Sequence, residues 1–135
     1  MIVVDTNVIA YLFIEGEMTA AAESALRRDA TWVAPLLWRS EMRNVLASTV
    51  RAGRLALGDA QRVMEGALDL LEGREYDVPS AQVLALAVTH GCSAYDSEFV
   101  ALAQDLKVSL VTSDRRLLAA FPQRAVSLAV FGAAA

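Results

Sequence analysis

Four acidic residues, Asp5, Glu41, Asp96 and Asp114, are the residues of this chain best suited to chemistry. Asp5, Asp96 and Asp114 lie at or just beyond turns into predicted helices, whereas Glu41 lies within a predicted helix among apolar residues. Two carboxylates about 6 Å apart repel by roughly 3 kcal/mol at an effective dielectric of about 20, so a cluster without a basic partner needs a cation. Ligand sets made only of oxygen suit Mg²⁺ or Mn²⁺. The residue types therefore predict a metal-dependent enzyme.

Three of these acids also have a structural explanation when each is considered alone. Asp5 and Asp114 could each cap the helix that follows. Asp96 lies three residues after Ser93, which is the spacing of a capping box. Capping therefore stays open as an alternative role for each of the three.

Glu41 is the acid that capping does not explain. It lies on the apolar half of its predicted helix, between Leu37 and Val45, where an unpaired carboxylate is costly. The alternative is a single glutamate at the edge of the core, paired with an arginine. Asp96 also faces inward on its predicted helix, whereas Glu98 lies toward the polar side. We therefore expect Glu98 at most to contact the metal ligands.

The apolar pattern along the chain alternates short β-branched runs with helical segments. Predicted strands cover residues 2–4, 31–34, 75–78, 109–112 and 126–128. Predicted helices cover residues 8–13, 19–28, 36–51, 59–71, 81–90, 94–106 and 115–120. Strands separated by helices imply crossover connections and a mainly parallel sheet. Ligands of open parallel sheets bind at the carboxyl ends of the strands, where Asp5 and Asp114 are both expected.

Composition narrows the class of protein further. A chain of 135 residues suggests one domain over residues 1–135, and no stretch is long enough to span a membrane. A single cysteine, Cys92, and an N-terminus without the features of a signal peptide fit the cytoplasm.

The only histidine, His90, leaves no plausible zinc site. The net charge of −4 is unexpected for a nucleic-acid enzyme, although arginine pairs can still form a local phosphate-binding patch.

Taken together, these motifs resemble the PIN domain. The matching features are Asp5-Thr6-Asn7 after a first strand, Glu41 in a central helix, SAYD at 93–96 opening a helix, and TSD at 112–114 after a late strand. More narrowly, the chain resembles the VapC-type ribonuclease toxins of prokaryotic toxin–antitoxin pairs, over essentially its whole length. The resemblance implies a PIN-like three-layer α/β/α sandwich with a mainly parallel central sheet of about five strands. It also implies an acidic pocket that holds one or two Mg²⁺ or Mn²⁺ ions, a homodimer, an RNA substrate and a cognate antitoxin.

On this basis the four acids are expected to be the catalytic metal ligands of an endoribonuclease. Thr6, Asn7 and Ser113 are expected to orient ligands or water around them. Arg115 and Arg116 directly follow Asp114 and are candidates for contacts with substrate phosphate, with simple solvent exposure as the alternative.

Two other classes of protein stay open. One is an Asp-based phosphoryl-transfer enzyme, but haloacid-dehalogenase phosphatases need a second aspartate where this chain has Asn7. Receiver domains need a lysine late in the chain, whereas Lys107 precedes its strand. The other class is a non-catalytic PIN-like binding module, in which mutual repulsion among four acids would serve no purpose.

Overall fold

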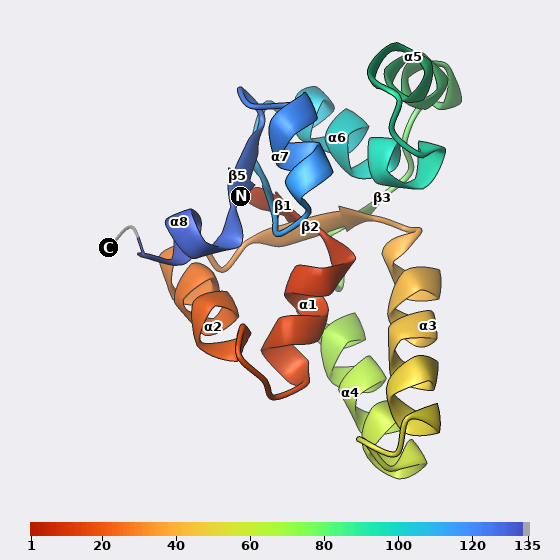
Figure 1. Ribbon diagram of the computed structural model, residues 1–135, viewed down its shortest axis with the longest axis vertical. Helices are drawn as coiled ribbons and strands as arrows, with labels where there is room; N and C mark the ends of the chain where they lie inside the picture. The colour runs from red at the N-terminus through yellow and green to blue at the C-terminus, as the bar shows by residue number, and fades with distance from the viewer. Residues whose placement is uncertain (134–135) are drawn as a thin grey trace.

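Five strands form one parallel sheet at the centre of the computed structural model, which describes residues 1–133 (Figure 1). The strands are β1 (Ile2–Val4), β2 (Trp32–Pro35), β3 (Glu75–Tyr76), β4 (Leu110–Thr112) and β5 (Ala125–Ser127). Their order is β3-β2-β1-β4-β5, and each neighbouring pair is parallel. In the central strand, Val3 pairs with Val33 on one side and with Leu110 on the other. The prediction of a mainly parallel sheet of about five strands is confirmed.

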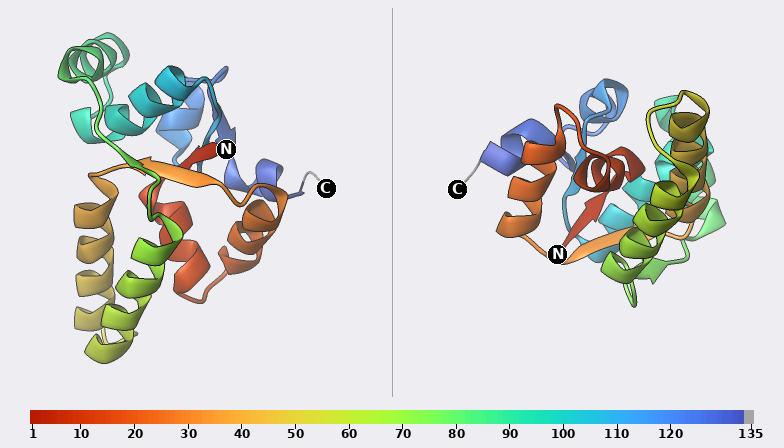
Figure 2. Two further views of the ribbon diagram at one scale, coloured as in Figure 1. Left: turned by 180° about the vertical axis from the view of Figure 1, so that it is seen from behind. Right: turned by 90° about the horizontal axis from the view of Figure 1, so that it is seen from below.

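Helices cover both faces of this sheet (Figures 1 and 2). They are α1 (Thr6–Phe13), α2 (Thr19–Arg28), α3 (Trp38–Arg51), α4 (Leu57–Leu70), α5 (Ser80–His90), α6 (Ala94–Leu106), α7 (Arg115–Ala120) and α8 (Leu128–Ala133). Helices α1 to α4 lie on one side of the sheet and α5 to α7 on the other, which gives the predicted three-layer sandwich. Within the described residues, no helix is both long enough and apolar enough to cross a membrane.

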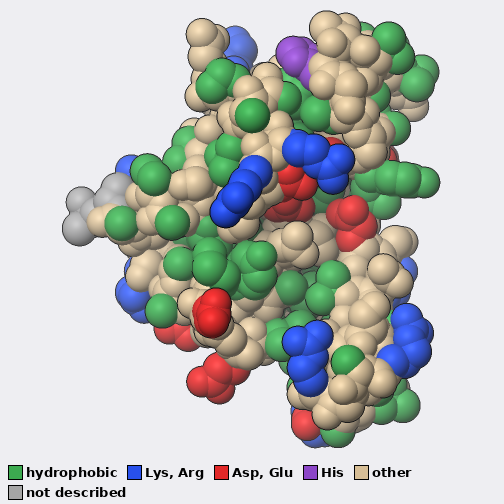
Figure 3. Space-filling model, viewed as in Figure 1, with side chains coloured by type: hydrophobic (Ala, Val, Ile, Leu, Met, Phe, Trp, Pro, Cys, Tyr) green, Lys and Arg blue, Asp and Glu red, His purple; other side chains and the backbone are tan. Residues whose placement is uncertain are grey.

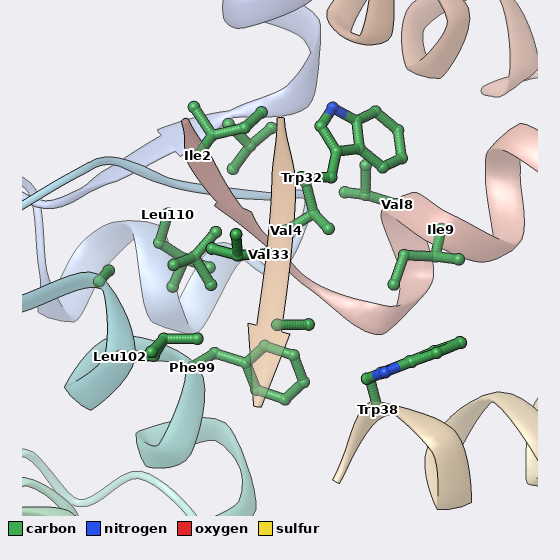
Figure 4. Packing of buried hydrophobic residues seen from close by; sticks show 14 of the residues in the cluster. Ile2, Val4, Val8, Ile9, Trp32, Val33, Trp38, Phe99, Leu102 and Leu110 are labelled. Carbon is green, nitrogen blue, oxygen red and sulfur yellow. The ribbon is translucent and has the colours of Figure 1, made fainter. Parts of the chain in front are cut away.

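The core forms where both faces of the sheet are covered. Val3 and Val33 are fully buried, as expected of parallel strands that are covered on both faces and carry β-branched runs. Phe99 from α6 and Ile9 from α1 pack around these strands (Figure 4). Full burial of such a side chain contributes about 1.5–3 kcal/mol. The packed strands therefore provide a rigid edge from which polar side chains can be positioned.

Helix α3 begins two residues later than predicted, at Trp38. The cause is tertiary: the backbone N–H of Leu36 donates to the carbonyl of Tyr76 at 3.1 Å, which extends the contact between β2 and β3. Glu41 therefore lies in the first turn of α3 and not in the middle of the helix. Carboxylates are favoured in a first turn because the backbone N–H groups there are partly positive.

Helix α8 was not predicted, because residues 126–128 read as a strand with no helix after it. The strand instead ends at Ser127, and the Ser127 hydroxyl accepts the backbone N–H of Val130 at 3.2 Å, which starts a helix. Helix α8 packs against α2, and Phe131 is buried there. The guanidinium of Arg28 lies 4.2 Å from the centre of the Phe131 ring.

Candidate active site

The four predicted acids line one pocket of about 390 Å³. Asp5 directly follows β1 and Asp114 lies beyond the end of the neighbouring strand β4, whereas Glu41 and Asp96 come from the first turns of α3 and α6. Figure 3 shows acidic side chains near the middle of this face, close to basic side chains. The sheet and two helix starts thus bring together residues that are far apart in the sequence. We call this the acidic pocket.

Asp5 is held by a residue that the sequence prediction did not include. Asp5 is buried, with 8% of its surface exposed, and Thr112 at the end of β4 donates from Oγ1 to Asp5 Oδ2 at 2.8 Å. The same Thr112 oxygen accepts the backbone N–H of Asp114 at 3.0 Å. Thr112 therefore links the acid after β1 to the acid beyond β4. Its place in the Thr-Ser-Asp motif was the available sequence signal.

Glu41 is held in a similar way by Thr6. The buried Thr6 hydroxyl donates to Glu41 Oε1 at 2.7 Å, so the predicted contact between Thr6 and an acid of the site is present. Asn7 is exposed and also lines the acidic pocket. Further pocket residues that the prediction missed are Ser40, Asn44 and Tyr95. Asn44 follows Glu41 by three positions on α3, a spacing that places both on one face of the helix.

The capping explanation holds for some acids and not for others. Asp114 Oδ1 accepts the backbone N–H groups of Arg116 and Leu117 at 2.8 and 3.2 Å, so Asp114 does cap α7. The backbone N–H of Asp96 donates to Ser93 Oγ at 3.0 Å, so Ser93 is the cap of α6.

Asp5 occupies the capping position of α1, but within the described chain its side chain makes no capping hydrogen bond. Capping therefore does not explain the burial of Asp5. Its carboxylate instead accepts a hydrogen bond from Thr112, which reaches it from the neighbouring strand β4.

The acids raise one another's pKa. Burial raises the pKa of Asp5 most, and the charges of Asp96 and Asp114 raise it further, against a lowering by the Thr112 hydrogen bond. Burial also raises the pKa of Glu41, with repulsion from Asp5, Asp96 and Glu98. For Asp96, burial and the charge of Asp114 raise the pKa. Within residues 1–133, the salt bridges join other groups and none includes these four acids.

The chemistry of the donors fits a hard divalent cation. The acidic pocket offers four carboxylates together with the Thr6 hydroxyl and the Asn7 amide, and oxygen donors of this kind suit Mg²⁺ and Mn²⁺. With the side chains as they stand in residues 1–133, no three Asp, Glu, His or Cys groups are close enough together to hold an ion. Metal binding would therefore require the carboxylates to move closer to one another, which their mutual repulsion now opposes.

Glu98 and Ser113 lie beside the acidic pocket and do not line it. Glu98 lines a separate pocket of about 420 Å³ with Leu36 and Tyr76, although its charge contributes to the raised pKa of Glu41. The Ser113 hydroxyl oxygen is buried and has no hydrogen-bond partner in the part of the chain that the structure describes.

The two candidate phosphate-binding residues are both exposed. Arg116 lowers the pKa of Asp96 through its charge, and it lines a pocket together with Asp96. Arg115 lines none of the pockets described here. Of the two arginines, Arg116 therefore lines a described pocket together with an acid of the site, whereas Arg115 does not.

Comparison with known proteins agrees with this fold. Residues 2–122 match the PIN domain family model. The chain is 32% identical over 124 residues to Ribonuclease VapC3 of Pyrobaculum aerophilum. This alignment covers 90% of this chain and 95% of that protein. It is also 35% identical over 79 residues to Exonuclease VapC9 of the same organism. This second alignment covers 58% of this chain and 59% of that protein.

A solved structure has the same fold. The crystal structure of PAE2754 from Pyrobaculum aerophilum matches with a TM-score of 0.78 at 24% identity. The match covers 97% of this chain and 92% of that one. The family model and the relative of nearly equal length lead to one conclusion: this chain belongs to the PIN domain family and is of the VapC type.

Proposed function

We propose that this protein is a divalent-metal-dependent endoribonuclease that hydrolyses RNA phosphodiester bonds at the acidic pocket. The observation that carries the proposal is that Asp5, Glu41, Asp96 and Asp114 line one pocket. No salt bridge within residues 1–133 neutralises them. Similarity to Ribonuclease VapC3 over 90% of the chain supports RNA as the substrate.

The four carboxylates would hold one or two Mg²⁺ or Mn²⁺ ions. When bound, such an ion lowers the pKa of a coordinated water and stabilises charge on the attacked phosphate. In hydrolysis, the water oxygen bonds to phosphorus, the bond from phosphorus to the 3′ oxygen breaks, and the 3′ oxygen ends with a proton. His90 does not line the acidic pocket, so we assign the acceptance of the proton that the water loses to a carboxylate of this pocket.

Other residues of the chain would position these groups. Thr112 holds Asp5, and Thr6 holds Glu41, each through a hydroxyl donor. Asn7 and Ser113 would orient water or ligands, since an amide and an unpartnered hydroxyl can each do so. Arg116, and Arg115 beside it, would contact phosphate.

We further propose that the chain acts as one domain over residues 1–135 and is the toxin of a toxin–antitoxin pair in the cytoplasm. The VapC name of its relative supports a cognate antitoxin as partner. Exposed apolar side chains support protein contacts, including those of a homodimer: Leu84 is 60% exposed and Val88 83% exposed on one side of α5.

The test is cleavage of RNA by the purified protein, freed of any antitoxin, with Mg²⁺, Mn²⁺ or EDTA. Linear and circular single-stranded RNA of one sequence would be compared, because a circle has no end for an exonuclease. We expect metal-dependent cleavage of both, and its loss in Asp5→Asn. Cleavage of the linear RNA alone would show an exonuclease.

A non-catalytic binding module is the second candidate. The observation that favours it is that, within residues 1–133, no three acids are close enough to hold an ion as they stand. Titration with Mn²⁺ in a calorimeter separates the two candidates, because a metal enzyme must bind the ion. Absence of both Mn²⁺ binding and cleavage would select the binding module.

A further inference from the structure

The acidic pocket shares lining residues with two further pockets. On one side it shares Asp96 with a pocket of about 500 Å³ beside α7, which we call the α7 pocket. On the other it shares Asn7 and Val45 with a pocket of about 240 Å³ between α1 and α3, which we call the α1 pocket. The acidic pocket is thus the one that adjoins both of the others, whose linings have no residue in common.

Each flanking pocket contains one arginine and one ring. The α7 pocket is lined by Arg116 and by His90, whose ring lies 4.4 Å from that of Phe121. The α1 pocket is lined by Arg54 and Tyr11. Both arginines are exposed, and among the described residues neither forms a salt bridge. Their guanidinium groups are therefore available to a ligand.

This combination suits a nucleic-acid strand. A guanidinium binds phosphate through two parallel hydrogen bonds, and rings such as His and Tyr stack on unpaired bases. Glu15, which also lines the α1 pocket, only accepts hydrogen bonds and would repel phosphate. It suits a base amino group or a ribose 2′-hydroxyl, which is the group that distinguishes RNA from DNA.

We infer that a single strand of RNA lies across the acidic pocket, from the α7 pocket at Arg116 and His90 to the α1 pocket at Arg54 and Tyr11. The inference rests on the proposed function and adds where the substrate lies. The strand is held on both sides of the bond that is cut. A binding pocket on each side fits the proposed cleavage inside a chain, since neither pocket has to hold a strand end.

The experiment compares two charge reversals with a matched control. Arg54→Glu and Arg116→Glu each alter one flanking pocket, whereas Arg27→Glu alters an exposed arginine on α2 that contacts Ser24 of its own helix. The substrates are a single-stranded RNA of about eight nucleotides, within the span that single-strand grooves cover, and a dinucleotide. The kcat and KM values are measured for both with Mn²⁺.

We expect each pocket variant to raise KM for the longer RNA by about tenfold, the equivalent of one charge-assisted contact of about 1.4 kcal/mol. The Arg54→Glu variant should cleave the dinucleotide like the wild type, because so short a substrate does not reach the α1 pocket. Arg27→Glu should match the wild type with both substrates.

The outcomes separate the inference from the proposed function. If the wild type cleaves RNA and Arg54→Glu behaves like Arg27→Glu, the path through the α1 pocket is wrong while the nuclease stands. Equal loss of dinucleotide and longer RNA cleavage in Arg54→Glu would also overturn it, because it would mean damage to the acidic pocket. If the wild type cleaves neither RNA, the proposed function fails and the path fails with it.

Discussion

Thr112 and Asp5 are 107 positions apart in the chain, and their side chains are joined by a hydrogen bond of 2.8 Å between Thr112 Oγ1 and Asp5 Oδ2. The same hydroxyl oxygen receives the backbone N–H of Asp114. One side chain thus sets the direction of one acid and the backbone position of another. A substitution that removes the Thr112 hydroxyl should therefore disturb two of the four proposed metal ligands at once.

Replacing Thr112 with valine tests this role. Valine has nearly the same shape but lacks the hydroxyl, so Asp5 Oδ2 and the Asp114 N–H both lose a partner. We expect Mn²⁺ affinity to fall about 10- to 100-fold, as for other groups that orient metal ligands. We also expect a loss of stability of about 1–3 kcal/mol. Calorimetric titration measures the affinity, and Thr112→Ser, which keeps the hydroxyl, should restore it.

The repulsion among the acids makes a prediction about stability. In the folded protein the pKa of Asp5 is raised above its usual 3.8. Protonated Asp5 therefore contributes fully to the stability of the fold below pH 3.8, and this contribution is lost as the pH rises through the folded-state pKa. Metal-free Asp5→Asn should therefore be more stable than the wild type at pH 7, with the difference vanishing toward pH 3.8.

Unfolding by urea across this pH range measures the effect. Mn²⁺ at about 100 times its dissociation constant should reverse the order, since it adds roughly 2.7 kcal/mol to the protein that binds it. A metal-free variant less stable than the wild type at pH 7 would argue against a repulsive cluster.

Glu41 and Glu98 offer a matched pair of glutamates. Both have a raised pKa, in each case caused first by burial, but only Glu41 lines the acidic pocket. Glu41→Gln should abolish Mn²⁺-dependent cleavage, whereas Glu98→Gln should keep the cleavage rate within about threefold, a change of roughly 0.65 kcal/mol in the barrier, because Glu98 does not line the acidic pocket. Cleavage rates under saturating Mn²⁺ decide the matter, and an equal loss in both variants would make Glu98 part of the metal site.

Glu75 gives the opposite dependence of stability on pH. Hydrogen bonds from Arg39 hold its pKa below the usual 4.5, and a bond of 2.7 Å from the Trp38 indole lowers it further. Its contribution is therefore present above about pH 4.5 and is lost as the pH falls below that value. Glu75→Gln should be less stable than the wild type at pH 7. The free energies of unfolding of Glu75→Gln and the wild type should converge as the pH falls below 4.5. A difference that does not change with pH would contradict this prediction.

The packing of α8 can be tested at Gly132. A Cβ atom there would lie 2.8 Å from the carbonyl oxygen of Ala21 in α2, so Gly132→Ala must push the two helices apart. We expect a loss of about 1–3 kcal/mol in the free energy of unfolding, typical of overpacking. Gly16→Ala is the control, since nothing lies within 4 Å of its added Cβ. Similar stability of the two variants would show that α8 adapts freely.

Much of the fold could be predicted because its signals are local. The β-branched runs of parallel strands are continuous along the chain, and the Asp5 and Asp114 positions follow from the ends of strands. The features that were missed depend on contacts between distant segments. The start of α3 is set by a bond from Leu36 to Tyr76, and the role of Thr112 is set by the pairing of β1 with β4. No short sequence window contains either pair.

The same reasoning applies to the candidate site. Residue types and order selected four acids, and the structure places all four around one pocket. Their separations depend on side-chain rotation and on two threonine hydroxyls, Thr6 and Thr112, whose partners lie on other elements. Each flanking pocket combines residues from segments far apart in the sequence, so sequence spacing alone could not group Arg54 with Tyr11 or Arg116 with His90.

The central position of β1 has a consequence for synthesis of the protein. Strand β1 leaves the ribosome well before its neighbour β4 and Asp114, which follow more than a hundred residues later, as the 107-residue separation of Thr112 from Asp5 shows. The acidic pocket cannot be complete until Asp114 has emerged. A chain whose synthesis has not yet reached Asp114 therefore lacks the site and cannot carry out the proposed cleavage, however much of the preceding chain has folded.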